Sequence, residues 1–247
     1  MTDVVAALAA ALNNDMDVMR AVSQNLANVN TSAYKREITY LSSFEHALQS
    51  ASSGAPRSVP ASGAFPLAGS VIDMQQGPLQ FTGNSFNLGL EGSGFLVVET
   101  AEGSRYTRKG SMQIDAQGRL ALVTGEPVLG ESGFIYLRPE PFEISSRGLV
   151  SQNGLDLATL KLIEFEQPSE LDYLGEGFFS DAGQTLVGQA FTGQVMQGYI
   201  EKSNVQTADE VVRMIEATRH FQTTHKVLQG YDGMLDTAIN VLGDLRN

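Results

Sequence analysis

Histidine is the side chain best suited to acid–base or metal chemistry near neutral pH, and this chain has three, His46, His220 and His225. Two ligands on one face of a helix need a spacing of four residues, whereas His220 and His225 are five apart. The spacing therefore favours solvated or seam-edge positions over a metal pair. The chain has no cysteine, which excludes thiolate zinc sites and cysteine nucleophiles.

The glycine-rich and serine-containing runs lack the spacing that catalysis or phosphate binding requires. Gly-Glu-Ser-Gly at 130–133 is not a nucleophile elbow, and Lys-Gly-Ser at 109–111 has no phosphate loop before it. The glycines at 89, 92 and 94 do not make a dinucleotide fingerprint, because no helix follows them. We therefore expect no catalytic residue, cofactor or metal, and a protein that is not an enzyme.

Charge and hydropathy exclude several kinds of partner. The net charge of −12 argues against nucleic acid and against an anionic membrane surface, since both attract clustered Lys and Arg. No run of about 18 apolar residues exists, so we expect no membrane insertion. Asp3 stands where a secretory signal would carry Lys or Arg, so we expect no cleaved signal peptide.

Both ends of the chain carry apolar residues at seven-residue spacing, with Asp15 as the one polar break in the first stripe. Such a repeat places a narrow apolar stripe on a helix and favours supercoiling against another helix. The two seams are predicted to be assembly interfaces. The first comprises Val5, Leu8, Leu12, Met19, Val22, Leu26 and Val29, and the second Met214, Phe221, Leu228, Tyr231, Leu235 and Leu242.

These seams can join the two ends to each other, to other copies, or only within one molecule as a helix pair that closes the domain. Helices are predicted over about 2–29 and 207–242, with a second short helix over 38–49. Gly230 and Gly233 weaken the last helix.

Between the ends, short apolar runs separated by Gly and Pro predict a mainly antiparallel sheet or barrel. The predicted fold class is α+β, with long N- and C-terminal helices pairing as a coiled-coil-like unit around a central β domain. The predicted domains are a discontinuous helical axial domain (1–49 and 201–247), a small-residue, Pro-rich linker (50–70) and the β domain (71–200).

Several segments resemble the bacterial flagellar rod and hook proteins. SQNLANVNTSAYKR at 23–36 matches their N-terminal signature, and GYIEKSNV at 198–205 matches the entry into their last helix. The runs at 78–84, 92–95, 106–110 and 115–118 are also similar, so the likeness covers nearly the whole chain. The family motif falls on Asn25, Leu26, Ala27, Asn28, Thr31, Tyr34, Lys35, Ser203, Asn204 and Val205.

One position departs from the family pattern. Gly usually precedes the aromatic residue of the first motif, where it permits a positive φ, and this chain has Ala33 instead. The modest length favours a rod protein over a hook protein. Glu-Pro-Val-Leu-Gly at 126–130 looks closer to the proximal-rod F-type than to the distal-rod G-type.

The resemblance implies a structural subunit that polymerises through its terminal helices into the periplasm-crossing rod. The implied partners are other rod proteins, copies of itself and the flagellar type III export apparatus, with a location in the basal body. The alternatives are a distal-rod or hook-like axial protein, a monomeric β module that binds peptide or glycan, and a hydrolase acting on peptidoglycan. The terminal heptads disfavour the last two.

Overall fold

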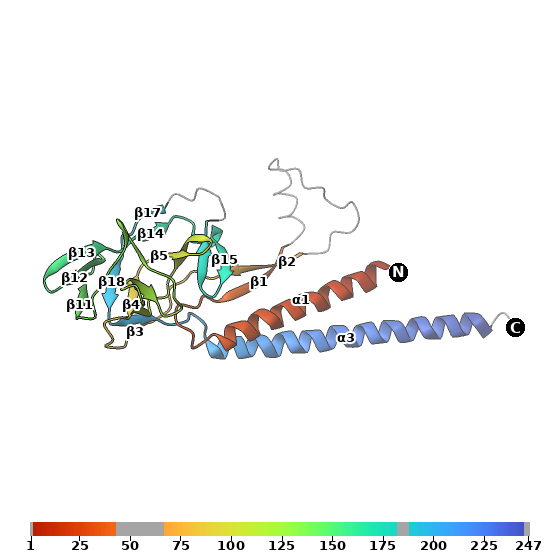
Figure 1. Cartoon of the computed structure of the whole chain (residues 1–247). Coiled ribbons are helices and arrows are strands. Elements are labelled where there is room, and N and C mark those ends of the chain that lie inside the picture. The colour runs from red at the N-terminus through yellow and green to blue at the C-terminus, as the bar shows by residue number, and fades with distance from the viewer. Residues whose placement is uncertain (1, 43–66, 182–187, 245–247) are drawn as a thin grey trace. The chain divides into compact units, whose positions relative to one another are not determined.

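The computed structural model describes residues 2–42, 67–181 and 188–244 (Figure 1). The chain divides into two compact units. The helical unit comprises Met1–Ala27, Glu37–Val71 and Gln206–Asn247, and the β unit comprises Asn28–Arg36 and Ile72–Val205.

Two antiparallel helices and a pair of strands make up the described part of the helical unit. Helix α1 (Thr2–Ala27) and helix α3 (Thr207–Asp244) lie side by side, and α3 is the longer (Figure 1). Asp209 and Glu210 in the first turn of α3 suit the positive end of its dipole. Strand β1 (Glu37–Ser42) pairs with β2 (Leu67–Ile72) and packs against α1.

The β unit is built from short strands whose described pairings are all antiparallel. Its largest sheet has the order β15-β16-β6-β5-β14-β17, and a second has the order β11-β12-β13. The remaining strands form the pairs β18-β4, β19-β3, β7-β8 and β10-β9. The bounds are β3 (Leu79–Phe81), β4 (Leu88–Glu91), β5 (Gly94–Thr100), β6 (Gly103–Thr107), β7 (Met112–Ile114), β8 (Leu120–Leu122), β9 (Leu129–Gly130), β10 (Gly133–Phe134), β11 (Phe142–Ile144), β12 (Leu149–Gln152), β13 (Leu155–Thr159), β14 (Leu162–Phe165), the 3-10 turn η1 (Pro168–Glu170), β15 (Asp172–Gly175), β16 (Phe178–Ser180), β17 (Gly188–Ala190), β18 (Gln194–Gln197) and β19 (Tyr199–Glu201).

Strand β5 lies at the centre of the β unit, between β6 and β14 of the largest sheet. Its five consecutive residues 94–98 are buried, so both faces of the strand are covered. It contributes to two apolar clusters. The larger includes Leu96 and Val98, and the smaller is aromatic, with Phe95 packed edge-on against Phe165 and Phe179. Edge-to-face aromatic packing adds to the stabilisation from burial alone. This core gives a rigid base to the loops that join its strands.

The predicted fold class is wrong. In the described residues the chain has two α-helices and a large antiparallel β-rich body, and its helical unit contains the strand pair β1-β2 as a third element. The helix contact also differs from a coiled coil of interlocking apolar side chains, because Asp15, Asn25, Glu210 and Thr224 are buried at it. Polar pairing between the helices and cover from β1 replace part of the expected apolar seam.

The short helix predicted over 38–49 is also wrong where the structure describes it, since 37–42 form strand β1. Its remainder, and most of the linker predicted over 50–70, lie outside the described residues. The predicted domain boundaries stay a prediction. Among the described helices, none is both long enough and apolar enough to cross a membrane.

Candidate functional site: the helix pair and a buried ion cluster

Three polar contacts fix the antiparallel register of α1 and α3. Asn25 Nδ2 donates to Glu210 Oε2 at 3.2 Å, and His220 Nδ1 lies 2.8 Å from each carboxylate oxygen of Asp15. From the first contact to the second, the position moves ten residues toward the N-terminus in α1 and ten residues toward the C-terminus in α3, as antiparallel helices require. Between them, Thr218 Oγ1 lies 3.9 Å from Met19 Sδ. Asn25 and Glu210 are buried, whereas the His220 side chain is 64% exposed, and a buried polar pair sets register more than it adds stability.

The predicted seam residues fall on both helices, with different degrees of burial. In the first seam, Val22 is buried and Val5 is exposed. The other residues of this seam are half-buried: Leu8, Leu12, Met19, Leu26 and Val29. Val29 lies in the turn after the helix. In α3, those half-buried are Met214, Phe221, Leu228, Tyr231 and Leu235. Leu242 lies in α3, but its side chain is outside the described part. Their role as an assembly interface stays a prediction.

Asn25 of the family motif joins three elements of the helical unit. Its side-chain amide donates to the carbonyl of Glu37 at 2.8 Å, and its oxygen accepts from the Glu37 N–H at 2.9 Å. With the additional bond to Glu210, this side chain, only 1% exposed, ties the end of α1 to the start of β1 and the first turn of α3. Of the other motif residues nearby, Ala27 ends α1 and is exposed.

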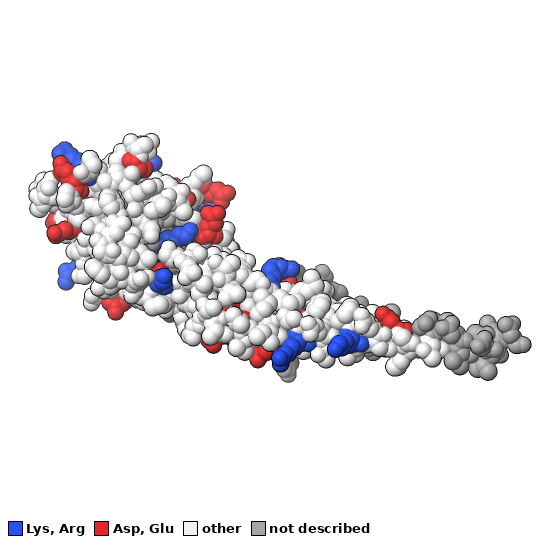
Figure 2. Space-filling view, turned by 90° about the horizontal axis from the view of Figure 1, so that it is seen from below, with Lys and Arg blue, Asp and Glu red and all other residues white. Residues whose placement is uncertain are grey.

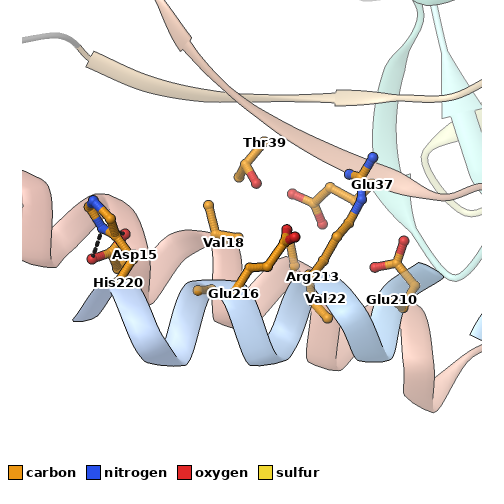
Figure 3. A pocket seen from close by; sticks show the side chains of 11 residues that line it. Asp15, Val18, Val22, Glu37, Thr39, Glu210, Arg213, Glu216 and His220 are labelled. Carbon is orange, nitrogen blue, oxygen red and sulfur yellow. Dashed lines mark hydrogen bonds and ion pairs between the residues drawn. The ribbon is translucent and has the colours of Figure 1, made fainter. Parts of the chain in front are cut away.

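A groove of about 500 Å³ runs along the helical unit between α1, α3 and β1. Figure 3 shows Glu216 and Arg213 of α3 and Glu37 of β1 turned toward its interior, with the Asp15–His220 pair at one end. Four carboxylates line the groove, those of Asp15, Glu37, Glu210 and Glu216, against one Arg and one His.

In the β unit, three of the segments that resemble the family meet at a buried ion cluster. Lys35 Nζ donates to Glu201 Oε1 at 2.6 Å, and Arg108 Nε donates to Glu201 Oε2 at 2.7 Å. The three side chains are at most 3% exposed. Lys35 comes from the first motif, Arg108 from the run at 106–110 and Glu201 from the run at 198–205, so one carboxylate joins distant parts of the chain.

Hydrogen bonds to backbone satisfy the remaining groups of this cluster. Lys35 also donates to the Gln75 carbonyl at 2.7 Å, and the Gly77 N–H donates to Glu201 Oε1 at 3.0 Å. Arg108 donates to the carbonyls of Gly94 and Leu90 at 2.6 and 3.1 Å. Burial lowers the pKa of Lys35, and the Arg108 charge adds to this, while the Glu201 carboxylate opposes it.

Neighbouring motif residues fasten the same segments. The Asn204 side chain accepts from the Arg36 N–H at 2.8 Å and donates to the Asp73 carbonyl at 2.9 Å. Ser203 Oγ accepts from the N–H of the buried Val205 at 3.2 Å. Thr31 Oγ1 donates to Asn28 Oδ1 at 3.1 Å within the preceding turn. These bonds hold the entry and exit of the β unit in fixed positions relative to its core.

Ala33 occupies the conformation that the family pattern reserves for Gly. Its φ is +56°, and its N–H donates to the Glu201 carbonyl at 2.9 Å. Tyr34, next along the chain, is buried. The turn before Lys35 is therefore kept despite the alanine, at the cost of backbone strain.

Sequence reasoning placed Lys35 in the site but missed Glu201 and Arg108. Both lie in runs that resemble the family, and Glu201 directly follows the apolar Ile200, which was the available signal. Nothing in the spacing indicated that they contact each other. His225, five residues from His220, stacks on Phe221 with ring centroids 6.3 Å apart, and within the described ranges no cluster of potential metal ligands forms.

Two family models and several known proteins match this chain. Residues 196–241 match the model of the flagellar basal body rod FlgEFG protein C-terminal region, and residues 89–159 match that of the flagellar hook protein FlgE/F/G D1 domain. The rod protein FlgG of Buchnera aphidicola subsp. Schizaphis graminum is 30% identical over 88% of this chain and 91% of its own. The rod protein FlgF of Escherichia coli is 30% identical over 90% and 91%, and that of Caulobacter vibrioides 27% over 95% and 94%.

The chain belongs to the flagellar basal-body rod protein family. It is a structural subunit of the rod in the flagellar basal body, where it assembles with other flagellar components, and it is not an enzyme.

Proposed function

We propose that this subunit polymerises through α1 and α3, with copies of itself and with other rod proteins, to form the proximal part of the drive shaft that crosses the periplasm. The observation that carries the proposal is the heptad-spaced row of half-buried side chains on α3, which includes Met214, Phe221 and Leu228. An apolar side chain that passes from half-buried to buried on assembly contributes up to about 1.5–3 kcal/mol.

The finer parts of the proposal rest on the resemblance and on the relatives. Relatives named FlgF support a proximal position, and relatives named FlgG keep a distal-rod or hook-like position as the alternative. Passage through the type III export apparatus without a cleaved signal is part of the same proposal. The helical axial domain, for which we proposed residues 1–49 and 201–247, would form the inner layer and the β domain the outer one.

Electron microscopy of basal bodies from a strain that lacks this gene tests the placement. We expect loss of motility and basal bodies that end before the distal rod. A rod that forms without a hook would move the protein to the distal level. Intact, motile flagella would refute a role in the rod shaft.

A substitution in the seam tests the polymerisation surface separately. We expect Leu228→Asp and Leu26→Asp to abolish motility, because a charge cannot be buried between helices without a partner. The β unit should stay folded, as measured by near-UV circular dichroism of the purified chain. Gln229→Asp, an exposed neighbour, is the matched control and should remain motile. Normal rods in Leu228→Asp cells would contradict the seam.

A further inference from the structure

The groove of the helical unit combines an acidic rim with an apolar floor. Val18, Ala21, Val22 and Ala217 line it alongside the charged residues, and Figure 3 shows Glu37 reaching in from β1 and Glu216 from α3, with Arg213 beside Glu37. Asp15 is paired with His220. By contrast, Glu37 and Glu216 form no side-chain ion pair with any residue that the structure describes. The opening therefore favours a ligand that carries positive charge on an aliphatic stem.

The same chain carries a surface of that chemistry on another side of α3. Val212 and Ile215 are 54% and 48% exposed, although both are large and apolar. Arg219 and Lys226 follow at heptad spacing from Val212, are exposed, and form no ion pair with the described residues. We name these four residues the outer strip. Figure 2, seen from the α3 side, shows separate basic and acidic groups along a mainly uncharged helical surface.

The groove and the outer strip face different sides of one molecule. At 100° per residue, the outer strip lies opposite the side of α3 that faces α1 and roughly 100° or more around the helix from Arg213 and His220. Glu216 stands at the edge of the groove nearest the strip, three residues before Arg219, whereas Lys226 is ten residues further along α3 and cannot reach the groove of its own molecule. A contact between two different faces of identical molecules is heterologous, and such contacts continue from copy to copy instead of closing in a dimer.

We propose that the outer strip of one copy docks into the groove of the next, with Arg219 or Lys226 facing Glu216 and Glu37. This inference rests on the proposed function and deepens it, because it names the surfaces that join two copies. The apolar floor receives Val212 or Ile215, and the charge pairs set direction and register. A groove of this size admits side chains of the neighbour and not a whole helix.

Crosslinking tests the contact directly, since the native chain has no cysteine. Two differently tagged copies, one with Glu216→Cys and one with Arg219→Cys, are expressed together in cells that lack the native gene. We expect a crosslinked product that carries both tags in isolated basal bodies. Gln229→Cys, exposed on the same helix but off the outer strip, replaces Arg219→Cys as the control. No product above this control in motile cells would overturn the proposal.

Charge exchange separates this proposal from the rod function itself. We expect Glu216→Arg and Lys226→Glu each to abolish motility, and their combination in one chain to restore it, with unchanged circular dichroism of all three; the two residues are ten apart on α3 and cannot pair within one molecule. If the combination fails to restore motility, the partner is not a second copy and the inference is wrong. If the single variants swim while the deletion strain does not, the inference fails and the rod function stands. Motility of the deletion strain would contradict both the contact between copies and the proposed rod function.

Discussion

At the scale of single residues, Ala33 shows how the chain keeps a family turn with an unfavourable side chain. Its φ of +56° is costly for any residue with a Cβ, by about 1–2 kcal/mol. Its methyl group is buried, which returns about 0.8 kcal/mol. These two contributions nearly cancel, so a residue without a side chain should serve about equally well.

We therefore expect Ala33→Gly to change the free energy of unfolding by less than about 1 kcal/mol. Ala33→Val should lower it by more than about 2 kcal/mol, because a β-branched side chain fits a positive φ poorly. Urea unfolding followed by circular dichroism measures both. Equal losses for the two variants would show that packing of the methyl group, and not φ, decides.

Asp115 illustrates a residue that organises a turn through its charge. Its carboxylate accepts from the N–H groups of Gln117 and Arg119 at 2.9 and 2.8 Å, and from Arg119 Nε at 2.7 Å. Desolvation alone would raise the pKa of Asp115, but these bonds outweigh it and lower the pKa below 3.8.

Since the folded-state pKa is lowered, the stabilisation by Asp115 is complete above the unfolded pKa and is lost as the pH falls through the folded pKa. We expect Asp115→Asn to lower the melting temperature at pH 6, and the difference from the native chain to shrink as the pH falls below 3.8. Thermal scans across this range measure it. A difference independent of pH would assign the effect to turn geometry alone.

At the scale of elements, α3 contains two glycines that no packing explains. A Cβ added at Gly230 or Gly233 would meet no heavy atom within 4 Å. Glycine in a helix costs about 0.8–1.0 kcal/mol relative to alanine, so this half of α3 is less stable than its length suggests.

Gly230→Ala and Gly233→Ala should each stabilise α3 by up to about 1 kcal/mol, visible as slower amide hydrogen exchange in its last turns. Gly77→Ala is the contrasting control, because its Cβ would lie 2.0 Å from the Lys202 carbonyl oxygen and should destabilise the β unit. Unchanged exchange in both α3 variants would mean that tertiary contacts already determine the order of this segment.

The sequence predicted some elements well and others not at all. The terminal helices followed from heptad periodicity, and the β character of the middle from its Gly and Pro punctuation. Strand β1 was predicted to be a helix, although Ile38, Thr39 and Tyr40 have strong strand preference. The ion cluster could not be predicted, because periodicity describes one element at a time and does not say that residue 35 meets residue 201.

At the scale of the whole molecule, one buried carboxylate neutralises two buried cations. Among the described residues, only Glu201 forms ion pairs with both Lys35 and Arg108. Removal of one partner from a buried ion pair leaves an uncompensated charge, which typically costs about 3–5 kcal/mol.

Glu201→Gln should therefore lower the free energy of unfolding by about 3–5 kcal/mol, or prevent folding of the β unit. Glu166→Gln, at an exposed position just after β14, is the matched control and should change it by less than about 0.5 kcal/mol. Chemical denaturation with near-UV circular dichroism distinguishes them. Equal stability of the two variants would mean that water or the backbone compensates the two cations.

The partners of this cluster lie far apart along the chain, so the cluster forms late in synthesis. Lys35 and Glu201 are 166 residues apart, so the ion pair cannot form until the ribosome has made most of the 247 residues. Contacts with such long sequence separation also close slowly, because the loop entropy is lost before the contact forms. A nascent or newly released chain therefore has a period in which its β unit is not yet folded. During that period an extended chain can be threaded through the proposed export apparatus.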